Sequence, residues 1–146
     1  MRKMKYFVFM ILLILLTGCA SVTNISKKKQ YNSFLGSKIL RGNAFICKRE
    51  KVPIFKRSLP KGQLFENHGH KNCPVGKDIA MLPIGSIITV HRVQLNGLYS
   101  LFMTDHWFIV GSTIFKGKKI PFYFYYGLGY RDNGQPIEPD LPPWEL

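Results

Sequence analysis

Acidic residues are scarce in this chain, which has 8 aspartates and glutamates against 21 lysines and arginines in 146 residues. The resulting net charge of +13 favours association with anionic partners and opposes binding to basic ones. The few carboxylates are scattered along the chain. Paired acids for general acid–base chemistry are therefore not expected.

Long apolar runs are also missing. The longest, Tyr6 to Leu16, has eleven residues, whereas a helix needs about 20 to cross a bilayer. Arg2, Lys3 and Lys5 precede it. A basic start followed by a short apolar run and small residues is typical of a secretory signal, which is removed from the mature protein. The sequence therefore predicts export rather than a retained transmembrane helix.

The residues that close this segment are Leu16-Thr17-Gly18-Cys19. They resemble the lipobox of bacterial lipoproteins. The resemblance implies a signal peptide over residues 1–18, cleavage before Cys19 and a diacylglycerol on its sulfur. Because Ala20 follows the cysteine, it also implies the periplasmic face of the outer membrane, or the outer face of the cell membrane in a Gram-positive source. The alternative is an ordinary signal peptide that is cut elsewhere.

Removal of the signal takes away three cations, so the mature chain carries 13 − 3 = +10. In a bacterial envelope the anions within reach are glycolipid phosphates, phospholipid head groups and peptidoglycan carboxylates. An exported protein rarely meets nucleic acid, so nucleic acid is not expected as a partner.

Cysteine is rare, with three residues in the chain. If Cys19 carries the anchor, Cys47 and Cys73 are left, and an even pair in an oxidising compartment favours a disulfide. Closing such a loop stabilises a fold by roughly 3–4 kcal/mol in the chain-entropy model. Free thiols and a metal site are the alternatives.

The mature chain divides into three parts by composition. Residues 19–33 are polar, with Lys27-Lys28-Lys29, and predict a lipid-anchored basic tether. Residues 34–130 form the predicted β-domain. Residues 131–146 are proline-rich, and there Trp144 either docks back onto the domain or inserts into a partner.

No stretch of the domain has apolar residues at helical spacing. Asn96-Gly97 between apolar runs predicts a hairpin turn, and the residues from Lys116 to Lys119 predict a second tight turn. We therefore expect an all-β domain of about five to seven antiparallel strands, either a compact sandwich or a small barrel. The segment Leu82–Val90 resembles a turn and strand of bacterial SH3-like domains, a likeness that covers roughly residues 35–130.

Motifs for metal binding and catalysis are weak. His68, His70 and Cys73 have ligand-like spacing, but a surface loop is the simpler interpretation, and a disulfide would remove the thiolate. Asp105 and His106 are adjacent in sequence, so their side chains point to opposite faces of a strand. No nucleophile-elbow serine and no zinc-protease helix occur. We expect no enzyme activity, no cofactor and no metal.

The most unusual feature is the aromatic stretch from Phe122 to Tyr126, followed by Tyr130. In a strand one face of this stretch packs into the core, and the other either presents tyrosines to a ligand or is covered as well. The residues expected to form a ligand-binding surface are Tyr123, Tyr125, Tyr130, Lys116, Lys118 and Lys119.

The sequence thus predicts a non-enzymatic, lipid-anchored module that binds a protein, peptidoglycan or an anionic glycolipid of the envelope. A protective lipoprotein, such as an immunity, entry-exclusion or phage-exclusion factor, is the alternative. A hydrolase or a metal-binding protein is a third class.

Overall fold

The computed structural model describes residue 6 and residues 20–48, 58–69, 73–74, 76–98, 104–130 and 134–145. Residues 16–19, which resemble a lipobox and include Cys19, lie outside the described residues. The described elements are β1 (Ala20–Asn24), the 3₁₀ helix η1 (Lys29–Phe34), β2 (Gly36–Ile39), β3 (Ala44–Lys48), β4 (Gly62–Glu66), β5 (Lys77–Leu82), β6 (Ile87–Leu98), β7 (Thr104–Phe115) and β8 (Lys118–Tyr130). Within these residues no helix is both long and apolar enough to cross a membrane.

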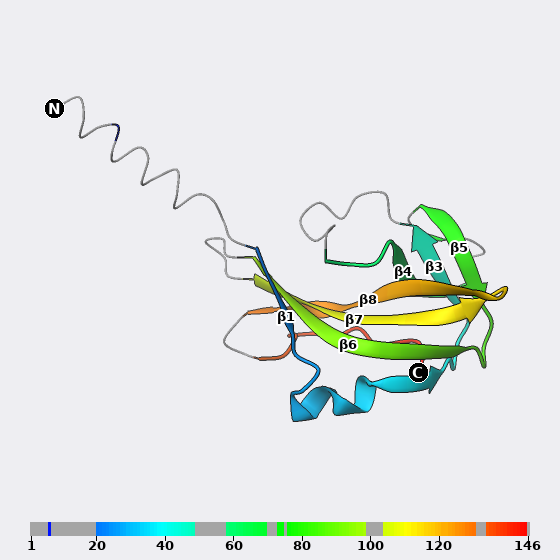
Figure 1. Ribbon diagram of the computed structural model, residues 1–146, viewed down its shortest axis with the longest axis horizontal. Coiled ribbons are helices and arrows are strands. Elements are labelled where there is room, and N and C mark those ends of the chain that lie inside the picture. Colours follow the sequence, from blue (N-terminus) through cyan, green and yellow to red (C-terminus); the bar gives the residue numbers. More distant parts are fainter. Residues whose placement is uncertain are drawn as a thin grey trace.

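The predicted all-β class is confirmed. The described residues form one mostly open sheet of eight strands in the order β1-β6-β7-β8-β4-β3-β5, with β2 also paired to β6. The strand count is larger than the five to seven expected, and the sheet is open rather than a closed barrel or two facing sheets. The three long strands β6, β7 and β8 lie side by side along the whole molecule (Figure 1).

The turn between β7 and β8 is the second tight turn expected from the sequence. It has two residues, Lys116 with φ 49° and Gly117 with φ 73°. Two successive positive φ values define the type I′ turn, whose twist matches that of the flanking strands. The ladder that follows runs without a break from Phe115 opposite Lys118 to Phe108 opposite Tyr125.

The hairpin turn predicted at Asn96-Gly97 is wrong. Both residues lie inside β6, where Asn96 pairs with His106 and is fully buried. Its side-chain oxygen accepts a hydrogen bond from Gln94 Nε2 at 2.8 Å. The strand continues because these amides bond to each other and to the segment that starts at Ser58. The connection from β6 to β7, residues 99–103, lies outside the described residues.

Strands β3, β4 and β5 form the other part of the sheet. β4 joins β8 in parallel where Gln63 lies opposite Tyr123. At this junction a Cβ on Gly62 would lie 2.5 Å from Ile46 Cγ2, so only glycine fits. Cys47 of β3 is bonded to Cys73, which is the disulfide expected from the sequence. β5 begins at Lys77, four residues after Cys73.

Residues 20–34 belong to the fold, so the predicted solvated tether over 19–33 is wrong for the part that the structure describes. β1 pairs with the end of β6, from Ala20 opposite Leu98 to Asn24 opposite Gln94. The following turn and η1 bury Tyr31 and Phe34. The three lysines from 27 to 29 are exposed; Lys27 and Lys28 lie between β1 and η1, and Lys29 begins η1.

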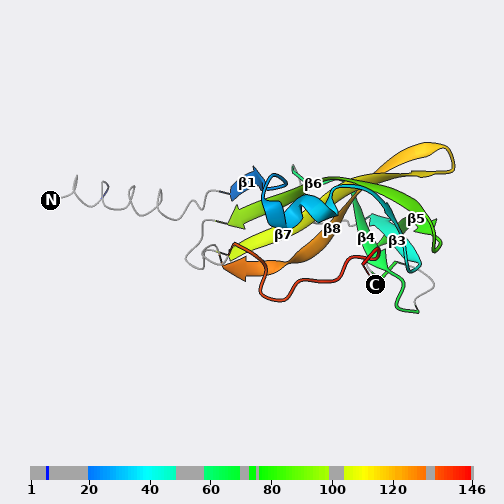
Figure 2. The ribbon, with the colours of Figure 1, turned by 90° about the horizontal axis from the view of Figure 1, so that it is seen from below.

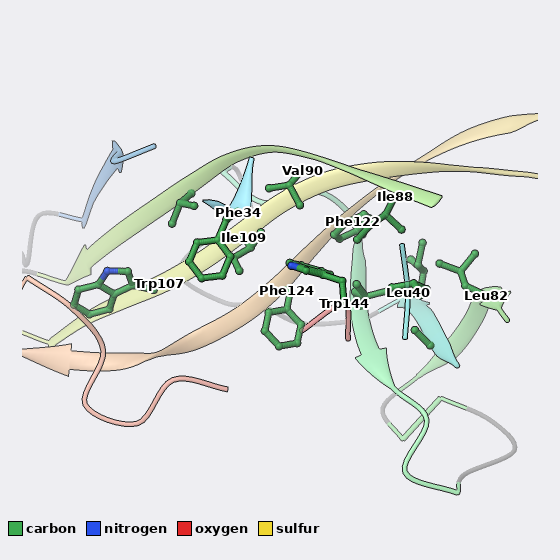
Figure 3. Packing of buried hydrophobic residues seen from close by; sticks show 14 of the residues in the cluster. Phe34, Leu40, Leu82, Ile88, Val90, Trp107, Ile109, Phe122, Phe124 and Trp144 are labelled. Carbon is green, nitrogen blue, oxygen red and sulfur yellow. The ribbon is translucent and has the colours of Figure 1, made fainter. Parts of the chain in front are cut away.

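The C-terminal tail completes the core, which confirms the expectation that Trp144 docks back. The tail runs beside β8 in Figure 2, and Asp140 N–H donates to the Tyr126 carbonyl at 2.9 Å. Of the two alternatives for Trp144, the structure shows docking onto the domain: the side chain is 4% exposed and its ring lies 6.0 Å from that of Phe124, edge to face. Figure 3 shows it beside Phe124 in the core that the sheet, η1 and the tail enclose.

Candidate binding surface

The aromatic strand β8 is covered on both faces over most of its length. Phe122 and Phe124 point into the main core, and Tyr123 lies on the opposite face in a second cluster with Phe108 and Val110. Tyr123 is 1% exposed, and its hydroxyl donates to Gln63 Oε1 at 3.3 Å. The prediction that Tyr123 forms part of a ligand-binding surface is therefore wrong.

Tyr125 is half-buried on the same face. Its ring meets that of Phe108 edge to face at 5.5 Å, and its hydroxyl lies 3.4 Å from His106 Nδ1. Burial raises the pKa of Tyr125, and the Asp140 carboxylate raises it further. Burial also lowers the pKa of His106, against the opposing effect of the Asp105 carboxylate. These shifts indicate packing between side chains rather than an open recognition site.

The predicted tyrosines and lysines do not form one surface. Lys116, Lys118 and Lys119 are exposed at the β7–β8 turn, whereas Tyr130 is exposed at the far end of β8. Twelve residue steps at about 3.3 Å each separate Lys118 from Tyr130, or roughly 40 Å. Figures 1 and 2 both show these two places at opposite ends of the sheet.

Around the lysine turn the structure instead gathers exposed isoleucines. Ile39 of β2 lies opposite Ile87 of β6. On the other side of β6, Ile88 lies opposite Thr113, so the antiparallel register brings Ile114 of β7 beside Ile87 in the same cross-strand row. The three side chains are 62%, 64% and 67% exposed. A row of large apolar side chains that no described residue covers is typical of a contact surface.

Lysine completes this row, because Ile114 lies opposite Lys119. Lys116 places its ammonium 5.4 Å from the centre of the Phe115 ring. Within the described part of the chain none of the three lysines of this turn has an ion-pair partner. We call this apolar row with its cationic end the isoleucine–lysine surface; it comprises Ile39, Ile87, Ile114 and Lys119, and Lys116 and Lys118 lie beside it at the turn.

Reasoning from the sequence missed the isoleucines of this surface. The signal that could have found them is the strand alternation, which places Ile87 and Ile88 on opposite faces so that only one of the two faces the main core.

Groups suited to catalysis are not brought together by the described residues. Asp105 is buried on the core face and His106 lies on the other, as their adjacency in sequence predicts. His91 Nε2 lies 2.7 Å from Ser112 Oγ, a pair that the sequence did not reveal. No described carboxylate bonds to His91, so a hydrolytic triad is not assembled in this part of the chain.

Metal ligands are also few among the described residues. Cys47, Cys73 and Asp78 form the one cluster with suitable distances, but both sulfurs are in the disulfide and Asp78 Oδ1 accepts the Cys73 N–H. His68 lies 3.3 Å from Glu66 instead, in an ion pair if it is protonated. His70 lies outside the described residues.

Two open pockets are lined by described residues. One, of about 260 Å³, lies between η1, β8 and the tail, with Tyr31, Tyr126 and Glu145 in its wall. The other, of about 220 Å³, lies beside β3 and β5 and includes Phe45 and Met81.

No known protein family matches this chain when it is compared with family models. Searches of curated proteins and of solved structures likewise find no significant match.

Proposed function

We propose that this protein is a non-enzymatic lipoprotein of the bacterial envelope, acylated at Cys19, which binds an envelope protein through the isoleucine–lysine surface. The lipobox resemblance and the basic, apolar start of the chain support the anchor. Ala20 after the cysteine supports the periplasmic face of the outer membrane as its location. Through the acyl chains on Cys19 the protein would be attached to the membrane, which is its first proposed partner.

The observation that carries the proposal is the position of this surface relative to the anchor. β1 begins at Ala20, directly after the proposed acylated cysteine, and lies at the end of the sheet opposite the β7–β8 turn (Figure 1). The binding surface is therefore displayed roughly 40 Å of strand length away from the anchored end. This distance suits contact with a partner outside the leaflet that holds the anchor.

The chemistry of the surface favours a protein partner. Lysines alone would suit any anionic polymer, because that attraction needs only charge. The three exposed isoleucines gain nothing from a highly hydrated polymer, but they would be buried against an apolar patch of a protein. We therefore expect an apolar patch with an acidic rim on the partner.

Site-specific photo-crosslinking in cells tests this proposal with the full, anchored chain. A photoreactive residue at Ile114 should give one discrete protein adduct, and the same residue at Ile137, a comparably exposed isoleucine of the tail (56% against 67%), should not. The adduct should be lost in a Lys119→Glu variant and kept in Lys27→Glu. Adducts with peptidoglycan or glycolipid, or equal yields at both positions, would overturn it.

The anchor needs its own measurement. Mass spectrometry of the parent should find acyl chains on Cys19, and a Cys19→Ala variant should leave the membrane fraction. An unmodified cysteine would refute the proposed attachment.

A further inference from the structure

The end of the sheet where β1 starts brings the first and last strands of the long ladder close together. Ala20 lies opposite Leu98, Gly97 opposite Asp105, and Thr104 opposite Tyr130. Neighbouring strands are about 4.8 Å apart, so three spacings place Tyr130 roughly 14 Å to the side of Ala20 at the same end of the sheet.

Exposed apolar side chains mark this end. Tyr130 is 55% exposed at the last position of β8. Two residues further along the strands, another cross-strand row consists of Val22, Asn96, His106 and Leu128. Its end residues Val22 and Leu128 are apolar, and they are 51% and 42% exposed. The isoleucine–lysine surface lies at the other end and does not account for these residues.

The covalent connection at this end is as short as a chain permits. One peptide bond joins Cys19 to Ala20, with Cα atoms 3.8 Å apart. Ala20 is already paired to β6, so no slack lies between the proposed lipid and the sheet. A tyrosine with an apolar ring and a polar hydroxyl is well suited to the boundary between head groups and acyl chains.

We infer that this end of the sheet rests on the bilayer, with Tyr130 at the level of the head groups and the strands directed away from the membrane. The inference deepens the proposed function and rests on acylation of Cys19. The contact is apolar rather than cationic, because the tail brings the exposed acids Glu138 and Asp140 alongside β8 near Leu128. It should therefore form on zwitterionic lipid and persist at high salt.

The test uses the acylated full-length protein in phosphatidylcholine vesicles whose acyl chains carry bromine, a quencher of tryptophan. Tyr130→Trp should lose most of its added emission in these vesicles, relative to unbrominated ones. Ile114→Trp, at a comparably exposed position at the opposite end, should lose none. Trp107 and Trp144 are 1% and 4% exposed, and the parent protein supplies their background.

Flotation of the vesicles separates the ways in which the test can fail. Protein that does not float with vesicles lacks the anchor, which overturns both the proposed attachment and this inference. Protein that floats while Tyr130→Trp keeps its emission overturns the inference alone. Quenching at both positions would mean that the sheet lies flat on the bilayer, which also overturns it.

Discussion

Replacing Trp144 by alanine should remove a large share of the stability of this fold. The indole is 4% exposed and packs edge to face on Phe124 at 6.0 Å, between the sheet and η1. Truncation of a buried tryptophan costs about 3–5 kcal/mol of unfolding free energy. Small domains have only about 5–15 kcal/mol in total, so we expect Trp144→Ala to be partly unfolded at 37 °C.

A Trp144→Phe variant separates packing from the indole N–H. Trp144 Nε1 is buried and has no hydrogen-bond partner among the described residues. Phenylalanine keeps an aromatic ring in the site and removes this unsatisfied donor, whose burial costs about 1–3 kcal/mol. That gain offsets the lost contact area, so we expect the variant to lie within about 1.5 kcal/mol of the parent.

Urea unfolding followed by far-ultraviolet circular dichroism measures both variants, with the disulfide kept oxidised. The unfolding midpoint of Trp144→Ala should fall sharply with an unchanged slope. A loss below about 0.5 kcal/mol, the size of ordinary surface substitutions, would refute the conclusion that the tail is part of the core.

Three further predictions concern stability. Replacing both Cys47 and Cys73 by serine should lower the unfolding free energy by about 3.5 kcal/mol, from the entropy of a loop closed over a sequence separation of 26; reduction of the parent should reproduce the loss. In the folded state His106 has a pKa below its ordinary 6.5, so the unfolded chain binds a proton more readily than the folded one. The unfolding free energy should therefore fall as the pH drops below about 6.5. Urea unfolding of a His106→Gln variant checks this, and the same pH dependence in that variant would contradict the role of His106. Lys116→Asn should raise the unfolding free energy by about 0.5–1 kcal/mol because its φ of 49° strains lysine more than asparagine, and a lower melting temperature would speak against it.

The all-β class could be predicted because it depends on local patterns: β-branched runs and a two-residue turn with glycine. The tether was mispredicted for the opposite reason. The polar residues of β1 have no local tendency to order, and they form a strand only because β6, 70 to 78 positions later, pairs with them. Asn96-Gly97 is a local turn signal that buried amide hydrogen bonds override.

The candidate surface also depends on contacts between distant parts of the chain, which local sequence patterns do not show. Alternation along β8 separates Tyr123 from Phe122 and Phe124, but it does not say whether the second face is covered. That is decided by Leu59, which packs against the cluster of Tyr123 from another part of the chain. Likewise the alignment of Ile39 with Ile87 depends on strand register, which no single stretch of sequence contains.

The way the two ends of the domain are built into the sheet and its core has a consequence for biogenesis. β1 has no partner until residues 94–98 have been synthesised, and the core stays open until Trp144 arrives. Long-range pairing of this kind slows folding. A nascent chain therefore cannot complete its fold until the tail has been made, and for the export that we propose this incomplete state is the one that a secretion channel would accept.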